Sequence, residues 1–565
     1  MPVIRKLIAV FLVAWLSLCL YIPAQAAPKF FAVVANSGGA TTSYNFLSGT
    51  LDPSLTFTRA SNATMYDSTG TLVYAPVNLL VQSNSFTTNW SASNTTITQG
   101  VTDPFGGTTA WTLTPSASNG GLSEGFPIIG STSYTLSLWV KAGTSAQTLT
   151  IGWYDGTTFH AIFVSPTSTW TRYSITGVSA ASPSGSYAYI SNSNGSVAGS
   201  FLIYGAQLEP TSYNSPRTYN PTTSAAYYGP RFDYNPSTLA LNGLLIEQQS
   251  TNILRQSNGF SNATYWTGAT AVTITPNNAI SPDGTQNATL VTATANTGYF
   301  TQALTLSANT TYTFSMWAKN VSGSSLAQFK IFDGANYSTG LTWSTVGSTW
   351  TRITRTFTTT GTVTGAYIYF NDTSSSGWSS NLIYGVQLEQ TSFATSYIPT
   401  QGSTATRLAD SLNNTSFTGF NNSAGTFFVE FIPETATGYV TTNGIVSFND
   451  GSSNNRISIR TQPSSASLQF RTVSGSASQY TDVLGATVAN TATKVGISYA
   501  ANSLVYAQDG TILGSESTYT TPTGINTLNI GNETGAGFYS GWIRSISYYN
   551  TQLTNAQLQT ISGQL

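Results

Sequence analysis

The side chains able to do acid–base or metal chemistry are few and scattered in this chain. It has one histidine, His160 in the stretch TTFHAIF, and 20 acidic residues among 565. A single histidine excludes histidine-based nucleophilic triads and metal sites built from several histidines. An ordinary strand histidine, either hydrogen-bonded or exposed, is the favoured interpretation of His160.

Paired carboxyl groups are the next chemistry to consider, because retaining glycosidases hold two of them about 5 Å apart. The nearest pair is Glu430 and Glu434 in VEFIPE, where Pro433 is expected to end the strand before Glu434. Asp155 in WYDG and Asp333 in IFDG precede glycine, as turn residues do. We therefore predict that the protein is not an enzyme, with polysaccharide hydrolysis as the least favoured alternative.

One loop offers oxygen ligands for a cation. Asp450, Asn454 and Asn455 in FNDGSSNNR are of the type that Ca²⁺ prefers, but the same residues also build turns between strands. The turn is favoured. No catalytic residue, cofactor or metal site is therefore predicted, and structural calcium stays an unsupported alternative.

Aromatic and basic residues on strand faces are the strongest candidates for ligand contacts. In YTLSLWVK, which starts at Tyr134, the aliphatic residues alternate with Trp139 and Lys141, and YTFSMWAK from Tyr312 repeats this pattern. The residues assigned by this alternation to a second, non-core face are Trp139, Lys141, Arg172, Tyr187 and Tyr189, and then Trp317, Lys319, Arg352, Tyr367 and Tyr369. Flat rings beside N–H donors suit a sugar, whose CH faces stack while its hydroxyls bond.

The alternative is that these rings pack beneath a loop or a neighbouring domain. If they are exposed platforms, replacing Trp139 and Trp317 by alanine should leave the fold nearly intact and remove ligand retention. A half-covered ring contributes about 2–3 kcal/mol, which predicts weak sites that act together.

Two long stretches repeat one another. NLLVQSNSF from Asn78 matches NILRQSNGF from Asn252, an offset of 252 − 78 = 174, and IYGAQLE from Ile203 matches IYGVQLE from Ile383, an offset of 383 − 203 = 180. Small insertions between strands kept in order indicate two copies of one folded domain.

Composition sets the fold class. Charged residues make up 7% of the chain, aromatic residues 13%, and the net charge is −1. Alternating runs such as RYSITG and FFVEFIP, separated by Gly, Asn, Ser and Pro clusters, predict an all-β fold of tandem β-sandwich (jelly-roll) domains. Nucleic-acid binding is excluded as a function because no basic cluster offers the necessary counterion release.

The first residues form an export signal. Arg5 and Lys6 precede the apolar run LIAVFLVAWLSLCLYI, and cleavage is expected after Ala26. An uncleaved anchor is the alternative. Cys19, the single cysteine, lies in this segment, so the mature chain is expected to have neither a disulfide nor a membrane span.

The chain then divides into consecutive segments. They are a signal peptide (1–26), a β-rich leader with a hairpin (27–77), a first carbohydrate-binding-like jelly roll (78–222), a connecting hairpin segment (223–251), a second such jelly roll (252–400), a linker (401–415) and a third domain (416–565).

Four phrases carry a resemblance to known proteins. FTRAS (57–61), PRFDYNP with GLLIEQQSTNIL (230–254), QLEQTSFATSYIPT with TATRLAD (387–410), and GWIRSISYYNTQLTNAQLQ (541–559) are similar to phage tail-fibre-associated and prophage-encoded proteins. In those, carbohydrate-binding-module-like jelly rolls precede a concanavalin A-like, laminin-G-like domain, which the resemblance implies here for residues 416–565. Because the first two phrases usually adjoin there, we expect residues 57–76 and 230–247 to pair into one small β unit.

The function predicted from these features is non-catalytic binding of cell-surface or extracellular glycans or polysaccharide through several weak sites. A structural fibre, tail or surface-layer component without a sugar ligand is the alternative. The expected location is secreted or at the cell surface, with a virion as the alternative, and homo-oligomerisation is left open.

Overall fold

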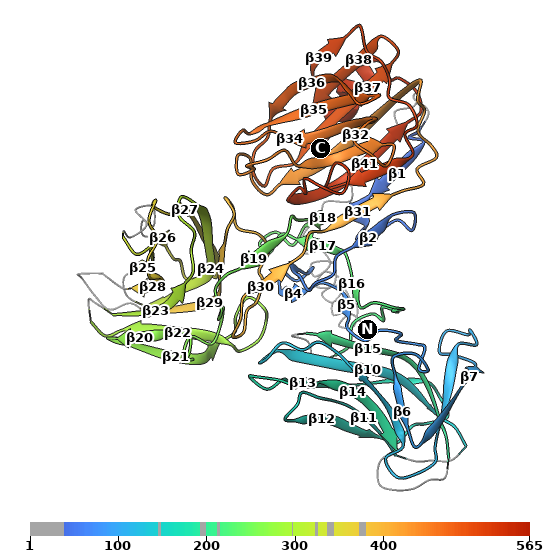
Figure 1. The fold of residues 1–565 in the computed structure, drawn as a ribbon, viewed down its shortest axis with the longest axis vertical. Coiled ribbons are helices and arrows are strands. Elements are labelled where there is room, and N and C mark those ends of the chain that lie inside the picture. The colour runs from blue at the N-terminus through green and yellow to red at the C-terminus, as the bar shows by residue number, and fades with distance from the viewer. Residues whose placement is uncertain are drawn as a thin grey trace, which may run out of the picture.

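The computed structural model describes residues 39–144, 148–192, 199–211, 215–295, 298–322, 326–335, 344–371 and 380–564. The expected signal peptide lies outside these residues. Strands dominate the described part of the chain, whose one α-helix is α2 (Asn555–Ser562), so the predicted all-β fold is confirmed. Figure 1 shows three sandwiches that meet around small central hairpins. No helix in the described residues is long and apolar enough to cross a membrane.

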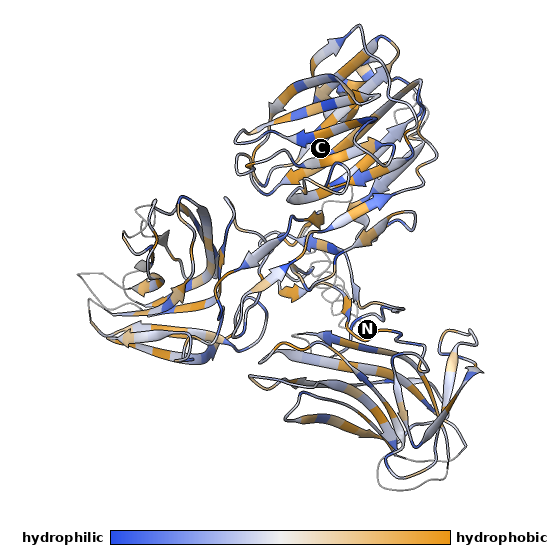
Figure 2. Ribbon diagram, viewed as in Figure 1, coloured by the Kyte–Doolittle hydropathy of each residue, from blue (hydrophilic) through white to orange (hydrophobic). Residues whose placement is uncertain are grey.

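The first sandwich has two five-stranded antiparallel sheets, β13-β10-β15-β8-β7 and β12-β11-β14-β9-β6. Its strands are β6 (Ser91–Ser93), β7 (Thr95–Val101), β8 (Ala110–Pro115), β9 (Gly121–Gly125), β10 (Ser133–Ala142), β11 (Leu149–Tyr154), β12 (Phe159–Val164), β13 (Thr171–Val178), β14 (Tyr187–Asn192) and β15 (Phe201–Pro210). The aliphatic residues of β10 lie in its core, as their alternation predicts. Figure 2 shows this alternation of apolar and polar residues along the strands.

The second sandwich repeats this strand order, with sheets β27-β24-β29-β22-β21 and β26-β25-β28-β23-β20. Its strands are β20 (Thr267–Thr270), β21 (Val272–Ala279), β22 (Ala288–Ala293), β23 (Tyr299–Leu304), β24 (Thr311–Ser322), β25 (Leu326–Phe332), β26 (Ser344–Thr345), β27 (Thr351–Thr358), β28 (Ala366–Asn371) and β29 (Ser380–Glu389). Each strand of one copy has its counterpart at the same place in the other, so the sequence repeat is a repeat of structure.

The third sandwich packs the sheet β17-β18-β41-β32-β37-β38-β39, with β1 also paired to β41, against β2-β31-β40-β33-β34-β35-β36. Its strands are β1 (Thr42–Asn45), β2 (Thr56–Thr58), β17 (Arg231–Tyr234), β18 (Leu241–Ile246), β31 (Ser411–Asn414), β32 (Ala424–Pro433), β33 (Gly444–Asn449), β34 (Arg456–Thr461), β35 (Ser467–Ser474), β36 (Ala477–Ala486), β37 (Thr493–Ala500), β38 (Ser503–Gln508), β39 (Thr511–Glu516), β40 (Thr527–Ile530) and β41 (Gly541–Tyr549). The helix α2 closes one face, and Thr554 and Gln557 form its N-terminal capping box.

Three segments expected to lie outside this sandwich are strands of it. The leader supplies β1 and β2, the connecting segment supplies β17 and β18, and the expected linker supplies β31. Their apolar side chains, among them Phe46, Leu244 and Leu412, share one buried core with Phe427. The expected start of the third domain at residue 416 is therefore wrong. The core of the third sandwich is completed by side chains from strands that precede residue 416.

Short hairpins connect the three sandwiches. β3 (Thr64–Tyr66) pairs with β4 (Leu72–Tyr74) around a turn at Asp67, β5 (Val77–Asn78) pairs with β16 (Tyr227–Tyr228), and β19 (Ser250–Asn252) pairs with β30 (Ala405–Arg407). β17–β18 pairs with β41 instead of β3–β4, so the expected shared β unit is wrong. The two hairpins still touch, because the Tyr66 amide donates to Asp233 Oδ1 at 2.7 Å.

Five buried charged residues join these segments, and we call them the buried charge network: Arg59, Arg231, Glu247, Arg407 and Asp410. Arg59 Nη1 lies 2.7 Å from Asp410 Oδ1, and Arg231 donates to both Asp410 and Glu247. Arg407 Nε lies 3.4 Å from Glu247 Oε2. The residues come from four segments separated by up to 351 positions, so their pairing fixes the path of the chain between the sandwiches.

Burial and the neighbouring charges shift the pKa values of residues in the buried charge network. Burial alone would raise the pKa of Glu247, but Arg407, Arg231 and hydrogen bonds from Ser396 outweigh it and lower this pKa from 4.5 to about 2. Burial lowers the pKa of Arg59 to about 10, against the opposing effect of Asp410. Glu247 and Arg59 therefore carry their charges at neutral pH.

Asp410→Asn should lower the free energy of unfolding by about 3–5 kcal/mol, because it leaves two buried guanidinium groups without full compensation. Urea unfolding measures this loss. The control is Asp52→Asn at an exposed turn, which should change stability by less than about 0.5 kcal/mol. Equal effects of the two substitutions would contradict the role of the network.

The depressed pKa of Glu247 makes part of the stability pH-dependent. A carboxylate with a lowered folded-state pKa stabilises the fold above its unfolded value of 4.5, and this contribution disappears as the pH falls from about 4.5 towards 2. The difference in unfolding free energy between the wild type and Glu247→Gln should therefore shrink across that window. Urea unfolding at each pH measures this difference. A difference in unfolding free energy that stays constant across the window would contradict a lowered pKa of Glu247.

Candidate functional site

The structure divides the predicted binding residues between two sheets of each sandwich. Trp139, Lys141 and Arg172 lie on β10 and β13, whereas Tyr187 and Tyr189 lie on β14 of the opposite sheet. The second copy divides its five residues in the same way, over β24 and β27 on one sheet and β28 on the other. The expectation that one face holds all five residues is therefore wrong. The alternation of side chains along a strand shows which of them point out of the core, but it does not show which sheet the strand joins.

In the first copy the tryptophan belongs to a partly open aromatic cluster. The Arg172 guanidinium lies 4.3 Å above the Trp139 ring and donates to Ser137 Oγ and to the Arg217 carbonyl. Phe105, Tyr204 and Tyr219 contact the same ring, and Phe105 is 69% exposed.

In the second copy the corresponding tryptophan is covered. Trp317 is 3% exposed, and its Nε1 donates to Tyr66 Oη at 3.1 Å from the β3–β4 hairpin, whose Leu72 packs in the same cluster. Arg352 lies 4.7 Å above the ring and donates to Ser315 Oγ and the Thr395 carbonyl. The expected exposed position of Trp317 is wrong, because the hairpin packs on it.

Both tryptophans require a glycine beneath them. Gly205 and Gly385, from the repeated IYG phrase, have φ of +63° and +64°, and a Cβ on Gly385 would lie 2.9 Å from the Trp317 ring. Glycine is thus the residue that permits both the left-handed backbone and the close ring contact.

The paired tyrosines of the first copy stand in a group of three half-buried tyrosine rings and one exposed phenylalanine ring. This group, the first platform, consists of Tyr154, Phe159, Tyr187 and Tyr189 on the outer face of β11, β12 and β14. Tyr154 and Phe159 stack with centroids 4.3 Å apart, and Phe159 is 60% exposed. The two tyrosine rings lie 6.2 Å apart. Such a surface presents several ring faces to solvent.

The second copy has an equivalent group, the second platform, which consists of Tyr299, Phe332, Tyr367 and Tyr369. Tyr367 lies 6.2 Å from Tyr369, and Phe332 lies opposite Tyr367 in the strand register. Tyr154 and Phe332 were not predicted as site residues, although their equivalent places in WYDG and IFDG could have revealed them.

The platforms also differ at the register position opposite the second tyrosine of each pair. The Tyr189 ring lies over Gly152, where a Cβ would come within 2.7 Å of the Tyr189 hydroxyl. Opposite Tyr369 the second copy has Lys330 instead. The two platforms thus share the tyrosine pair and the ring at the place of Tyr154 and Phe332, but they differ in their fourth ring and in this charge.

The other residues considered for catalysis or metal binding make contacts that stabilise the fold. Asp155 accepts from the amides of Thr157, Thr158 and Ala180, and these bonds hold its pKa below the ordinary value against the opposing effect of burial. His160 stacks on Trp153 with centroids 3.9 Å apart.

Asp333 and Asp450 likewise accept hydrogen bonds within or next to their own turns. Glu430 pairs with Arg544 at 2.7 Å, while Glu434 follows the strand end, as expected. Among the described residues no cluster of three His, Cys, Asp or Glu could hold a metal ion.

Comparison with known proteins bears on the second copy. A family model described as a carbohydrate binding domain matches residues 252–377. No curated protein matches the chain.

Similar solved structures include the CBM40 of a Ruminococcus gnavus IT-sialidase bound to α2,3-sialyllactose, at 14% identity over 25% of this chain and 83% of that one (TM-score 0.22). The CBM22-1–CBM22-2 tandem of Paenibacillus barcinonensis Xyn10C is 13% identical over 56% of this chain and 97% of its own (TM-score 0.22). Domain 4 of AbnA, an arabinanase from Geobacillus stearothermophilus, in complex with arabinotriose, is 14% identical over 30% and 81% (TM-score 0.24).

The two tryptophans should respond differently to truncation. Trp317→Ala removes a buried ring and should cost about 3–5 kcal/mol of unfolding free energy. Trp139→Ala removes a half-buried ring and should cost at most about 2 kcal/mol. Thermal and urea unfolding measure both losses, and each variant is the control for the other. Equal losses of unfolding free energy would contradict the assignment of Trp317 as buried and Trp139 as half-buried.

Proposed function

We propose that the protein binds glycans without catalysis through its first and second platforms. The observation that carries the proposal is the repeated group of aromatic rings on the outer face of the same sheet in both copies. Aromatic faces of this kind stack on the CH faces of sugars. The carbohydrate-binding-domain match over residues 252–377, which contain the second platform, supports it.

The magnitudes favour binding at several points. Half-covering one ring gives about 2–3 kcal/mol at roughly 25 cal/mol/Å². After the cost of association, two rings support about millimolar affinity. Two platforms on one chain raise the effective affinity for a polysaccharide, because the second contact forms within the same complex.

The ligand class follows from charge. The net charge is −1 and charged residues make up 7% of the chain, so long-range attraction to an anionic polymer is small. Neutral or weakly charged glycans at a cell surface or outside the cell are the proposed ligands, and export through residues 1–26 is part of the proposal.

A structural fibre, tail or surface-layer component is the second candidate. Its supporting observation is that Trp317, an equivalent of the partly open Trp139, is used to dock one part of the chain on another. Aromatic surfaces of this chain therefore can serve assembly as well as ligands.

Replacing all four paired tyrosines, Tyr187, Tyr189, Tyr367 and Tyr369, by alanine should abolish retention on neutral polysaccharides such as β-glucan, xylan, mannan or galactan in affinity electrophoresis. The reason is that these partly exposed rings form the pair that both platforms share, while the cores are formed by other residues.

Phe105→Ala is the matched control, because Phe105 is an exposed ring on the Trp139 side of the first sandwich. It should keep retention. Loss of retention in this control alone, or failure of the wild type to bind any of these polymers, would reject the platforms as the binding surface.

A further inference from the structure

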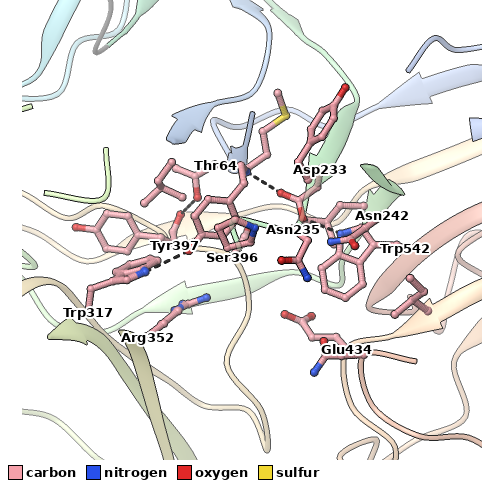
Figure 3. Close-up of a pocket in the computed structure, with 18 residues that line it drawn as sticks. Thr64, Asp233, Asn235, Asn242, Trp317, Arg352, Ser396, Tyr397, Glu434 and Trp542 are labelled. Carbon is pink, nitrogen blue, oxygen red and sulfur yellow. Dashed lines mark hydrogen bonds between the residues drawn. The ribbon is translucent and has the colours of Figure 1, made fainter. Parts of the chain in front are cut away.

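A pocket of about 230 Å³ lies where four parts of the chain meet: the β3–β4 hairpin, the β17–β18 hairpin, the second sandwich and the third sandwich. Figure 3 shows the side chains that surround it. At about 30 Å³ for each water molecule, it has room for about eight. This volume suits one sugar ring and not an oligosaccharide.

Two tryptophans from different sandwiches border the pocket. Trp317 belongs to β24 and Trp542 to β41. Trp542 Nε1 donates to Asp233 Oδ2 at 2.8 Å, and the Tyr66 amide holds the other oxygen of Asp233. The orientation of the Trp542 ring is thus fixed by a carboxylate whose two oxygens are both bonded.

Two other polar groups of the pocket are not satisfied. Within the described residues the Glu434 carboxyl has no hydrogen bond or ion pair, and its Oε2 is buried. Arg352 uses Nη2 for Ser315 and Thr395, but its buried Nε has no partner. Burial also raises the pKa of Glu434 well above the ordinary value. Buried polar groups without partners cost free energy, and a ligand that bonds to them recovers it.

Among the described residues, the Glu434 carboxyl and the Arg352 Nε–H both lack a hydrogen-bond partner in this pocket. A ligand that both donates and accepts hydrogen bonds would satisfy them. Hydroxyl groups do both. The side-chain amides of Asn235, Asn242 and Asn490, which also line the pocket, add further partners of the same kind. A neutral hydroxyl can bond to both open groups, including a Glu434 carboxyl whose protonated form burial favours, without bringing a further charge into the pocket.

We propose that this junction pocket binds a single neutral sugar ring, held against Trp542 with its hydroxyls bonded to Glu434. The site is separate from both platforms and its ligand is a monosaccharide unit, such as the end of a glycan chain. Because the lining comes from two sandwiches and two hairpins, the bound sugar also stabilises the junction between them.

The test uses the methyl glycosides of glucose, galactose and mannose with the full mature chain. At millimolar concentration at least one should raise the melting temperature and show saturation-transfer NMR contacts. Glu434→Leu, which removes the carboxyl at similar volume, should abolish both effects. The variant lacking the four platform tyrosines should keep both, which separates this site from the proposed function.

If Glu434→Leu does not fold, Asn242→Leu replaces it, since Asn242 is half-buried at the pocket wall. Loss of binding in that variant supports the proposal equally. Binding unchanged in a folded pocket variant, no effect of any of the three glycosides on the wild type, or binding of a methyl glucuronide alone would overturn it.

Discussion

The structure depends on the pairing of three buried guanidinium groups with two buried carboxylates. Arg59, Arg231 and Arg407 meet Asp410 and Glu247 where the chain passes between sandwiches. Since an isolated buried charge costs several kcal/mol, the fold is stable only when all four contributing segments arrive together. The third sandwich consequently takes strands from residues 42–58, 231–246 and 411–549, with the two copies of the repeated sandwich inserted between them.

This arrangement gives the two repeated sandwiches different neighbours. The β3–β4 hairpin, placed beside the network, packs on Trp317 of the second copy and leaves Trp139 of the first copy half-buried. The opposite sheets keep their exposed rings in both copies. Duplication thus preserved one aromatic surface, which we propose contacts ligands, and diverted another to hold the molecule together.

The sequence was informative where a local pattern has one physical outcome. Alternation identified the core residues of β10 and β24, and the repeat predicted two sandwiches of identical strand order. Each of these depends on residues close together in the chain.

Long-range partners were not predictable in the same way. Arg59 and Asp410 lie 351 positions apart, and no local pattern shows that they pair. The phrases FTRAS, PRFDY, GLLIE and TATRLAD, which carry the resemblance to tail-fibre-associated proteins, contain the residues of the buried charge network. The phrases that resemble other proteins most clearly therefore contain residues that hold the fold together. The platform rings lie in stretches of sequence that carry no such resemblance.

Hydroxyl-radical footprinting with and without a retained neutral polysaccharide measures the central claim most directly. The account predicts that oxidation of Tyr187, Tyr189, Tyr367 and Tyr369 falls when the polysaccharide is bound, while oxidation of Phe105 is unchanged. Unchanged oxidation of these four tyrosines together with protection of Phe105 and Trp139 would contradict it.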